Sequence, residues 1–147
     1  MVAIKKVINF RHLSLVTGNI SELKKILTKF LNLKIIKNFP IQSGAYINQL
    51  TGIKDAKIKV IYFELTNSII LEVIEYSKKT KKNQKANSIG FSHFSITVKN
   101  IDQLYKESKK YDIKFISEPL LTAKNKIKVA YIIVMGESLI ELVQELP

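Results

Sequence analysis

The sequence predicts an α+β fold in which two tandem βαβββ modules form one domain. First, 147 residues with 46% hydrophobic content suit a single domain with a sizeable core. Second, the stretch that begins at Phe10 recurs from Phe91. Third, each half combines one helical apolar pattern with several strand patterns. We therefore expect residues 1–147 to form a single domain with module one at about 7–76, a linker at 77–90 and module two at about 91–145.

The repeat keeps its register over a long stretch. The offset is 81 residues, and seven positions are identical: Phe10/Phe91, His12/His93, Ser14/Ser95, Asn19/Asn100, Ile20/Ile101, Leu23/Leu104 and Lys25/Lys106. The offset then slips to 80, and residues 33–36 resemble residues 113–116. Each half also closes on a similar apolar strand with one glutamate, at 70–74 and 139–143. A match that includes both ends of the unit is specific for a duplication.

Each half should contain the same elements in the order strand, helix, strand, strand, strand. The first half has them at about 7–17, 20–31, 33–39, 57–65 and 69–76, and the second half at 91–98, 101–111, 113–117, 126–134 and 138–145. Hairpin turns are expected at Asn67-Ser68 and at Gly136-Glu137-Ser138.

Local signals support these boundaries. The strands show alternating apolar residues, and the first helix carries an apolar stripe with helical spacing. Asn19 and Asn100 are residue types that favour the N-cap of a helix. Pro40 and Pro119 follow the second strand of each half, where proline can end strand pairing. The linker 77–90 is polar, lysine-rich and without periodicity, as a connector should be.

Composition excludes several classes of protein. With no cysteine, the chain has neither a disulfide scaffold nor a thiolate metal site. We find no signal peptide and no apolar run long enough to cross a bilayer, so we expect a cytoplasmic protein with no membrane association. The net charge is +12, yet Arg11 is the only arginine, whereas nucleic-acid readers usually rely on arginine. We favour compositional bias over nucleic-acid binding, and a basic surface could also attract an anionic small substrate.

The first strand of each half presents a polar face. Strand alternation places His12 with Ser14, and His93 with Ser95, opposite apolar neighbours. This face is polar enough to line a cavity, with Ser14 and Ser95 as candidate pocket residues.

The last strand of each half carries one glutamate within an apolar run, Glu72 or Glu141. A buried carboxylate needs a partner or a metal. The chain has only two histidines, and they are repeat mates. If the halves are related by a local two-fold axis, His12, Glu72, His93 and Glu141 would surround one divalent ion such as Zn, Ni, Co, Mn or Fe(II). The alternative is two sheet histidines held by hydrogen bonds.

These positions resemble the vicinal oxygen chelate superfamily, which includes glyoxalase I, methylmalonyl-CoA epimerase, fosfomycin-resistance proteins, extradiol dioxygenases and bleomycin-binding proteins. The resemblance covers essentially the whole chain. It implies a curved mixed sheet around a central cavity, with metal ligands on the first and last strands of each module. The best-matching stretches are 10–16, 70–76, 90–98 with 100–102, 115–119 and 139–143.

The ligand set His12, Glu72, His93 and Glu141 is most similar to that of glyoxalase I. Epimerase-like members often have glutamine at the position of Glu72, and dioxygenase-like members leave that position free. The chain departs from the family in the turn at 135–138, usually Asp-Pro-Asp-Gly, and residues 40–56 match no substrate-defining pattern.

The resemblance implies a metal-dependent isomerase or lyase that stabilises an enediolate during proton transfer next to a carbonyl, with Glu72 or Glu141 as the catalytic base. Two alternatives remain open: an Fe(II) ring-cleaving dioxygenase, and a non-catalytic small-molecule-binding protein of the resistance type. We also expect a homodimer, because an open sheet leaves edges to cover. The sequence leaves open whether the modules pair within one chain or across two.

Overall fold

The computed structural model describes residues 9–80, 89, 91–122 and 126–147. Residues 7–8 of the first predicted strand and most of the predicted linker 77–90 lie outside the described residues. The contacts divide the chain into two compact units, Met1–Val16 with Leu33–Ser77 and Thr17–Asn32 with Lys78–Pro147. The segment that carries the first helix therefore groups with the second half of the sequence.

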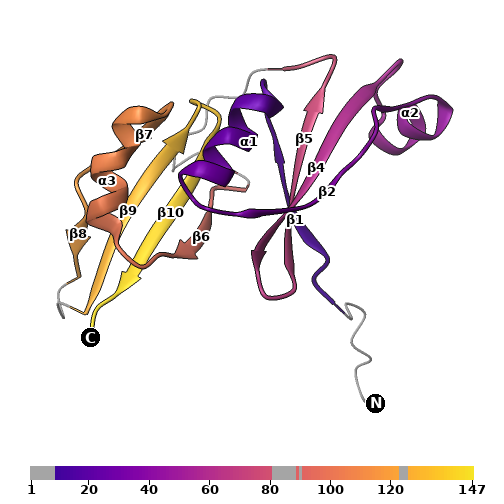
Figure 1. Cartoon of the computed structure of the whole chain (residues 1–147). Coiled ribbons are helices and arrows are strands. Elements are labelled where there is room, and N and C mark those ends of the chain that lie inside the picture. Colours follow the sequence, from indigo (N-terminus) through magenta and orange to yellow (C-terminus); the bar gives the residue numbers. More distant parts are fainter. Residues whose placement is uncertain (1–8, 81–88, 90, 123–125) are drawn as a thin grey trace. The chain divides into compact units, whose positions relative to one another are not determined.

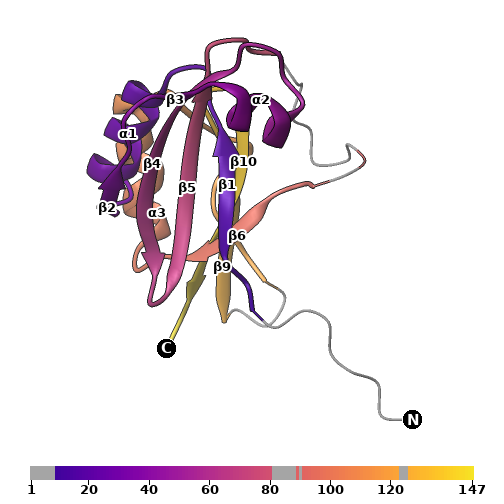
Figure 2. The ribbon, with the colours of Figure 1, turned by 90° about the vertical axis from the view of Figure 1, so that its right-hand side faces the viewer.

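The first unit contains a five-stranded mixed sheet in the order β1-β5-β4-β2, with β3 also paired to β4 (Figure 1). β1 runs parallel to β5, and the other pairs are antiparallel. The elements of this unit are β1 (His12–Val16), β2 (Lys34–Asn38), β3 (Gln42–Ser43), α2 (Ala45–Thr51), β4 (Lys57–Thr66) and β5 (Ile69–Tyr76). β1, β5 and β4 lie side by side in Figure 2.

The second unit repeats this topology with the order β6-β10-β9-β7, and β8 also pairs with β9. Its strands are β6 (Phe94–Thr97), β7 (Ile113–Phe115), β8 (Leu120–Leu121), β9 (Ile127–Val134) and β10 (Ser138–Glu145). Its helices are α1 (Ile20–Lys29), α3 (Ile101–Glu107) and the short 3₁₀ turn Ser108–Lys110. α3 packs on β9 and β10 (Figure 1).

The predicted α+β class and the two βαβββ modules are confirmed, and the strands form one five-stranded sheet from each half. The predicted elements agree with the structure to within a few residues where they are described. The predictions omitted β3, β8 and α2. In the second hairpin the turn residues are 135–137, with positive φ at Met135 (55°) and Gly136 (66°), so it begins one residue before the predicted turn. None of the described helices is long and apolar enough to cross a membrane.

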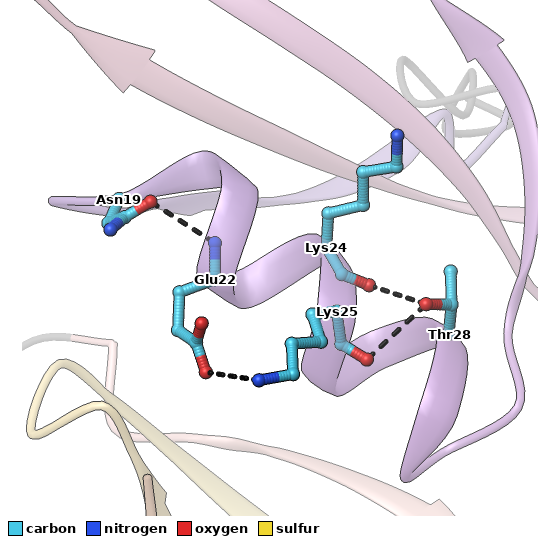
Figure 3. A network of polar contacts seen from close by, with 5 residues as sticks. All are labelled: Asn19, Glu22, Lys24, Lys25 and Thr28. Carbon is cyan, nitrogen blue, oxygen red and sulfur yellow. Dashed lines mark hydrogen bonds and ion pairs between the residues drawn. The ribbon is translucent and has the colours of Figure 1, made fainter. Parts of the chain in front are cut away.

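Both main helices begin with the predicted asparagine caps. The Asn19 side chain accepts a hydrogen bond from the Glu22 N–H at 3.1 Å, and Glu22 forms an ion pair with Lys25 at 3.8 Å (Figure 3). The Asn100 side chain accepts the equivalent hydrogen bond from the Gln103 N–H at 3.0 Å. Each cap satisfies one backbone donor that the first turn of a helix leaves free. The repeat in the sequence is therefore also a repeat in local structure.

Alternation along the strands builds the core of each sheet. In β5, Leu71 and Val73 are fully buried, and in β10, Ile140 and Leu142 are fully buried. The same alternation places the intervening residues on the opposite face of the sheet. On that face of the first unit, α2 packs Ile47 against a cluster built on β4 and its surroundings, formed by Ala56, Ile58 and Val60.

Glu137 fixes the chain that leads into α1. Its carboxylate accepts hydrogen bonds from the Thr17 hydroxyl at 2.8 Å and from the Gly18 N–H at 2.7 Å. The Thr17 hydroxyl in turn accepts from the Asn19 N–H at 3.1 Å, and Thr17 is buried. A Cβ at position 18 would lie only 2.6 Å from the Glu137 Oε1 atom, so a larger residue there would displace the carboxylate from its present position. The β9–β10 turn thus holds the start of α1 within the second unit.

The Glu137→Ala variant should lose about 2 kcal/mol of unfolding free energy, because two donors, one of them buried, lose a charged acceptor. Denaturant unfolding of the purified variant measures this loss. The matched control is Glu145→Ala, which makes the same charge change at an exposed strand end. Equal stabilities of the two variants would contradict the role given to Glu137.

Candidate metal and proton-transfer site

Strand pairing brings a histidine and a glutamate together in the first unit. Ser14 on β1 lies directly beside Glu72 on β5, and His12 is two residues earlier on the same face. The His12 Nε2 atom lies 3.2 Å from the Glu72 Oε2 atom. Both side chains are partly buried, with 32% of His12 and 14% of Glu72 exposed. The predicted neighbours His12 and Glu72 therefore meet.

The second unit repeats this arrangement. Ser95 on β6 lies directly beside Glu141 on β10, and His93 precedes β6 by one residue. The His93 Nε2 atom lies 3.9 Å from the Glu141 Oε2 atom, an ion-pair distance that is too long for a hydrogen bond. Ser14 and Ser95 are both exposed beside their glutamates. The repeated sequence positions thus occupy repeated places in the two sheets.

Each unit contains one His–Glu pair. Among residues 9–80, 89, 91–122 and 126–147, no three His, Asp or Glu side chains form a group that could hold a metal ion. That His12, Glu72, His93 and Glu141 bind one ion together stays a prediction. Each pair supplies one imidazole nitrogen and one carboxylate oxygen, a donor set that divalent Zn, Ni, Co, Mn and Fe accept.

A tyrosine accompanies each pair. Tyr62 lies directly opposite Glu72 across β4 and β5 and forms a hydrogen bond with its carboxylate. Burial raises the pKa of the Tyr62 phenol, and the charge and hydrogen bond of Glu72 raise it further, while Arg11 lowers it. Because the phenol stays protonated, it can donate to Glu72 at neutral pH. Phe39 packs edge-on against the Tyr62 ring, with 4.8 Å between centroids.

The imidazole of His93 lies between two hydroxyl groups. The Tyr131 hydroxyl is 3.3 Å from Nε2, and the Ser92 hydroxyl is 3.0 Å from Nδ1. The Tyr131 ring meets the imidazole edge-on at 4.9 Å between centroids. On the sequence alone, Tyr46, Tyr62 and Tyr131 could line a pocket or an interface, although core packing is the commoner role for such aromatic residues. A sharper signal was available, because a tyrosine precedes each glutamate by ten residues. Tyr46 is 71% exposed on α2.

Comparisons with known proteins give a consistent family. Residues 11–131 match the family model of the Glyoxalase/Bleomycin resistance protein/Dioxygenase superfamily. A comparison with curated proteins gives no match.

Similar solved structures have low sequence identity. A glyoxalase family protein from Bacillus cereus is 16% identical, with a TM-score of 0.86 over 100% of both chains. A trypanothione-dependent glyoxalase I from Leishmania major is 17% identical, with a TM-score of 0.67 over 95% of this chain and 88% of that one. The fosfomycin resistance protein FosX from Listeria monocytogenes is 14% identical, with a TM-score of 0.61 over 92% of each chain. At these identities the likeness shows the fold.

The raised pKa of Tyr62 has a direct optical test. Phenolate absorbance is titrated in the wild type and in Tyr62→Phe, and the difference between the two curves is the titration of Tyr62. That difference should appear above pH 10, the ordinary pKa of tyrosine, because burial and the Glu72 carboxylate disfavour the phenolate. Glu72→Gln should move it to lower pH. A Tyr62 transition at or below pH 10 in the wild type would contradict the described contact.

Proposed function

We propose, since this chain belongs to the Glyoxalase/Bleomycin resistance protein/Dioxygenase superfamily, that it is a divalent-metal-dependent isomerase or lyase of the glyoxalase I or methylmalonyl-CoA epimerase type. The proposed reaction moves a proton at the carbon next to a substrate carbonyl. The observation that carries the proposal is the His–Glu pair repeated at equivalent strand positions, His12 with Glu72 and His93 with Glu141.

We propose that one divalent ion is held by both pairs. His12, Glu72, His93 and Glu141 together offer two imidazole nitrogens and two carboxylate oxygens, which suit Zn, Ni, Co, Mn or Fe. When bound, such an ion supplies positive charge for the negative charge that develops on substrate oxygen atoms as the proton leaves. In the first unit Glu72 is engaged with His12 and Tyr62, which supports its role as a ligand. This favours a four-ligand site over the three-ligand site of a dioxygenase.

The geometry supports Glu141 as the group that moves the proton. A general base must be able to reach the substrate carbon and return the proton to it. Glu141 is 25% exposed and lies 3.9 Å from His93, whereas Glu72 is 14% exposed and is held by two contacts. Glu72 and Glu141 are equal candidates on sequence alone. The looser carboxylate is the one that can change partners during a reaction, so we assign the transfer to Glu141 and the anchoring role to Glu72.

The exposed serines and the net charge bear on the substrate. Ser14 and Ser95 lie on the same faces as the two pairs and can donate hydrogen bonds to substrate oxygens. A net charge of +12 favours approach of an anionic substrate such as a carboxylate or a phosphate-bearing thioester. β1 and β6 are the outermost strands of their sheets, and an open edge is commonly covered by association, so we further propose a homodimer.

Metal binding is the first test. Elemental analysis and calorimetric titration of the purified protein with Zn, Ni, Co, Mn and Fe should show that two His–Glu pairs together bind one ion. His12→Ala and His93→Ala should each abolish tight binding, because each removes one ligand from the same ion. The control is Glu145→Gln at an exposed strand end. The absence of binding by all five ions would refute the metal proposal.

Proton exchange tests the chemistry. The loaded enzyme should exchange the proton at the α-carbon of a hemithioacetal or of a CoA thioester with solvent deuterium. Glu141→Gln should slow this exchange by about 10²-fold to 10⁴-fold while metal is still bound, since general acid–base catalysis typically contributes that much. Glu72→Gln should instead act mainly on metal affinity. Equal exchange rates in Glu141→Gln and in Glu145→Gln would refute the assignment of Glu141.

A further inference from the structure

Tyr62 and Tyr131 occupy the same place in the two halves. Tyr62 lies directly opposite Glu72 in the antiparallel pairing of β4 with β5, and Tyr131 lies directly opposite Glu141 in the pairing of β9 with β10. Directly opposed residues of an antiparallel pair project from the same face with their side chains in contact range. Each candidate half-site therefore consists of a histidine, a glutamate and a tyrosine.

The two hydroxyl groups nevertheless contact different partners. The Tyr62 hydroxyl is hydrogen-bonded to the Glu72 carboxylate. The same carboxylate lies 3.2 Å from the His12 Nε2 atom. The Tyr131 hydroxyl lies 3.3 Å from the His93 Nε2 atom instead. The tyrosine therefore contacts the carboxylate in the first half and the imidazole in the second half.

The two hydroxyl contacts of His93 are compatible with a neutral tautomer that carries its proton on Nδ1. A neutral imidazole has one donor nitrogen and one acceptor nitrogen. A Tyr131 hydroxyl that donates to Nε2 requires the proton on Nδ1, and Ser92 then accepts at 3.0 Å. In this tautomer the lone pair is on Nε2, the nitrogen nearer to Glu141. A ligating histidine needs such a lone pair, and its orientation is usually fixed by a bond from the other nitrogen.

We propose that Tyr62 and Tyr131 are positioning residues that make two equivalent His–Glu pairs unequal. Tyr62 holds the Glu72 carboxylate as an anchored ligand. Tyr131 orients the His93 imidazole with the proton on Nδ1 and the lone pair on Nε2, and it contacts that nitrogen instead of the Glu141 carboxylate. The part that concerns metal and proton transfer rests on the proposed function, whereas the tyrosine contacts are properties of the metal-free protein.

Nitrogen NMR of the two imidazoles in metal-free protein tests the contacts directly. Tyr131→Phe should shift the Nε2 resonance of His93 and leave that of His12 unchanged, because only His93 loses a donor. The matched control is Tyr46→Phe, which removes a hydroxyl from an exposed tyrosine and should shift neither histidine. Circular dichroism verifies folding. If Tyr131→Phe does not fold, the test uses Ser92→Ala, which removes the hydroxyl that contacts Nδ1 of the same imidazole. This variant should shift the nitrogen resonances of His93. Spectra of Tyr131→Phe or Ser92→Ala that match Tyr46→Phe would overturn the proposal for His93.

Metal affinity tests the anchoring role of Tyr62. Calorimetry with Zn or Ni should show affinity about 10-fold to 100-fold lower in Tyr62→Phe than in the wild type, the usual effect of removing a partner of a ligand. Tyr131→Phe should bind at least as tightly as the wild type, since the ion no longer competes with a hydroxyl for Nε2. Unchanged affinity in Tyr62→Phe would overturn the anchoring role. A wild type that binds no ion refutes the proposed function instead, and the NMR comparison then decides the tyrosine proposal alone.

Discussion

Strand register is the constraint on which the candidate site depends. The parallel pairs β1–β5 and β6–β10 set Ser14 beside Glu72 and Ser95 beside Glu141. Because strand side chains alternate between faces, a slip of one residue would turn a glutamate toward the buried face. In β5 that face is formed by Leu71 and Val73, which are completely buried. The hydrophobic pattern of the core therefore also fixes which face carries the charged groups.

A carboxylate in the middle of an apolar strand carries a cost. Removing a charge from water is unfavourable unless hydrogen bonds and opposite charge compensate, and apolar residues of similar size often stabilise such a position as well or better. In the first half, His12 and Tyr62 provide compensation for Glu72. In the second half, Glu141 has a weaker contact with His93 at 3.9 Å. The same costly combination occurs in both sheets, as the proposed binding or catalytic role predicts.

The sequence was sufficient for elements that repeat or have clear periodicity. Asn19 and Asn100 identified both helix starts because an N-cap is a local interaction. The segment 40–56 lacked such a signal. α2 has seven residues, buries only Ile47 and exposes Tyr46 and Leu50, so no amphipathic stripe is visible. β3 and β8 have two residues each and exist through their pairing with β4 and β9, which a local pattern cannot reveal. The grouping of α1 with the second half likewise depends on tertiary contacts such as those of Glu137.

The candidate site shows the same division between what is local and what is not. The four ligand candidates could be found from the repeat, because identity and strand parity are readable in one dimension. The partners of Tyr62 and Tyr131 could not, because they depend on side-chain contacts across the sheets.

The backbone at the two helix caps is nearly the same: Asn19 has φ −147° and ψ 97°, and Asn100 has φ −149° and ψ 96°. Yet the His–Glu distances are 3.2 Å and 3.9 Å. The residue before each histidine also differs, Arg11 in one half and Ser92 in the other. The charge of Arg11 lowers the pKa of Tyr62, while Ser92 contacts the imidazole of His93 itself. Since the strand pairing is repeated and these neighbours are not, the side chains around each pair can account for the proposed difference between Glu72 and Glu141.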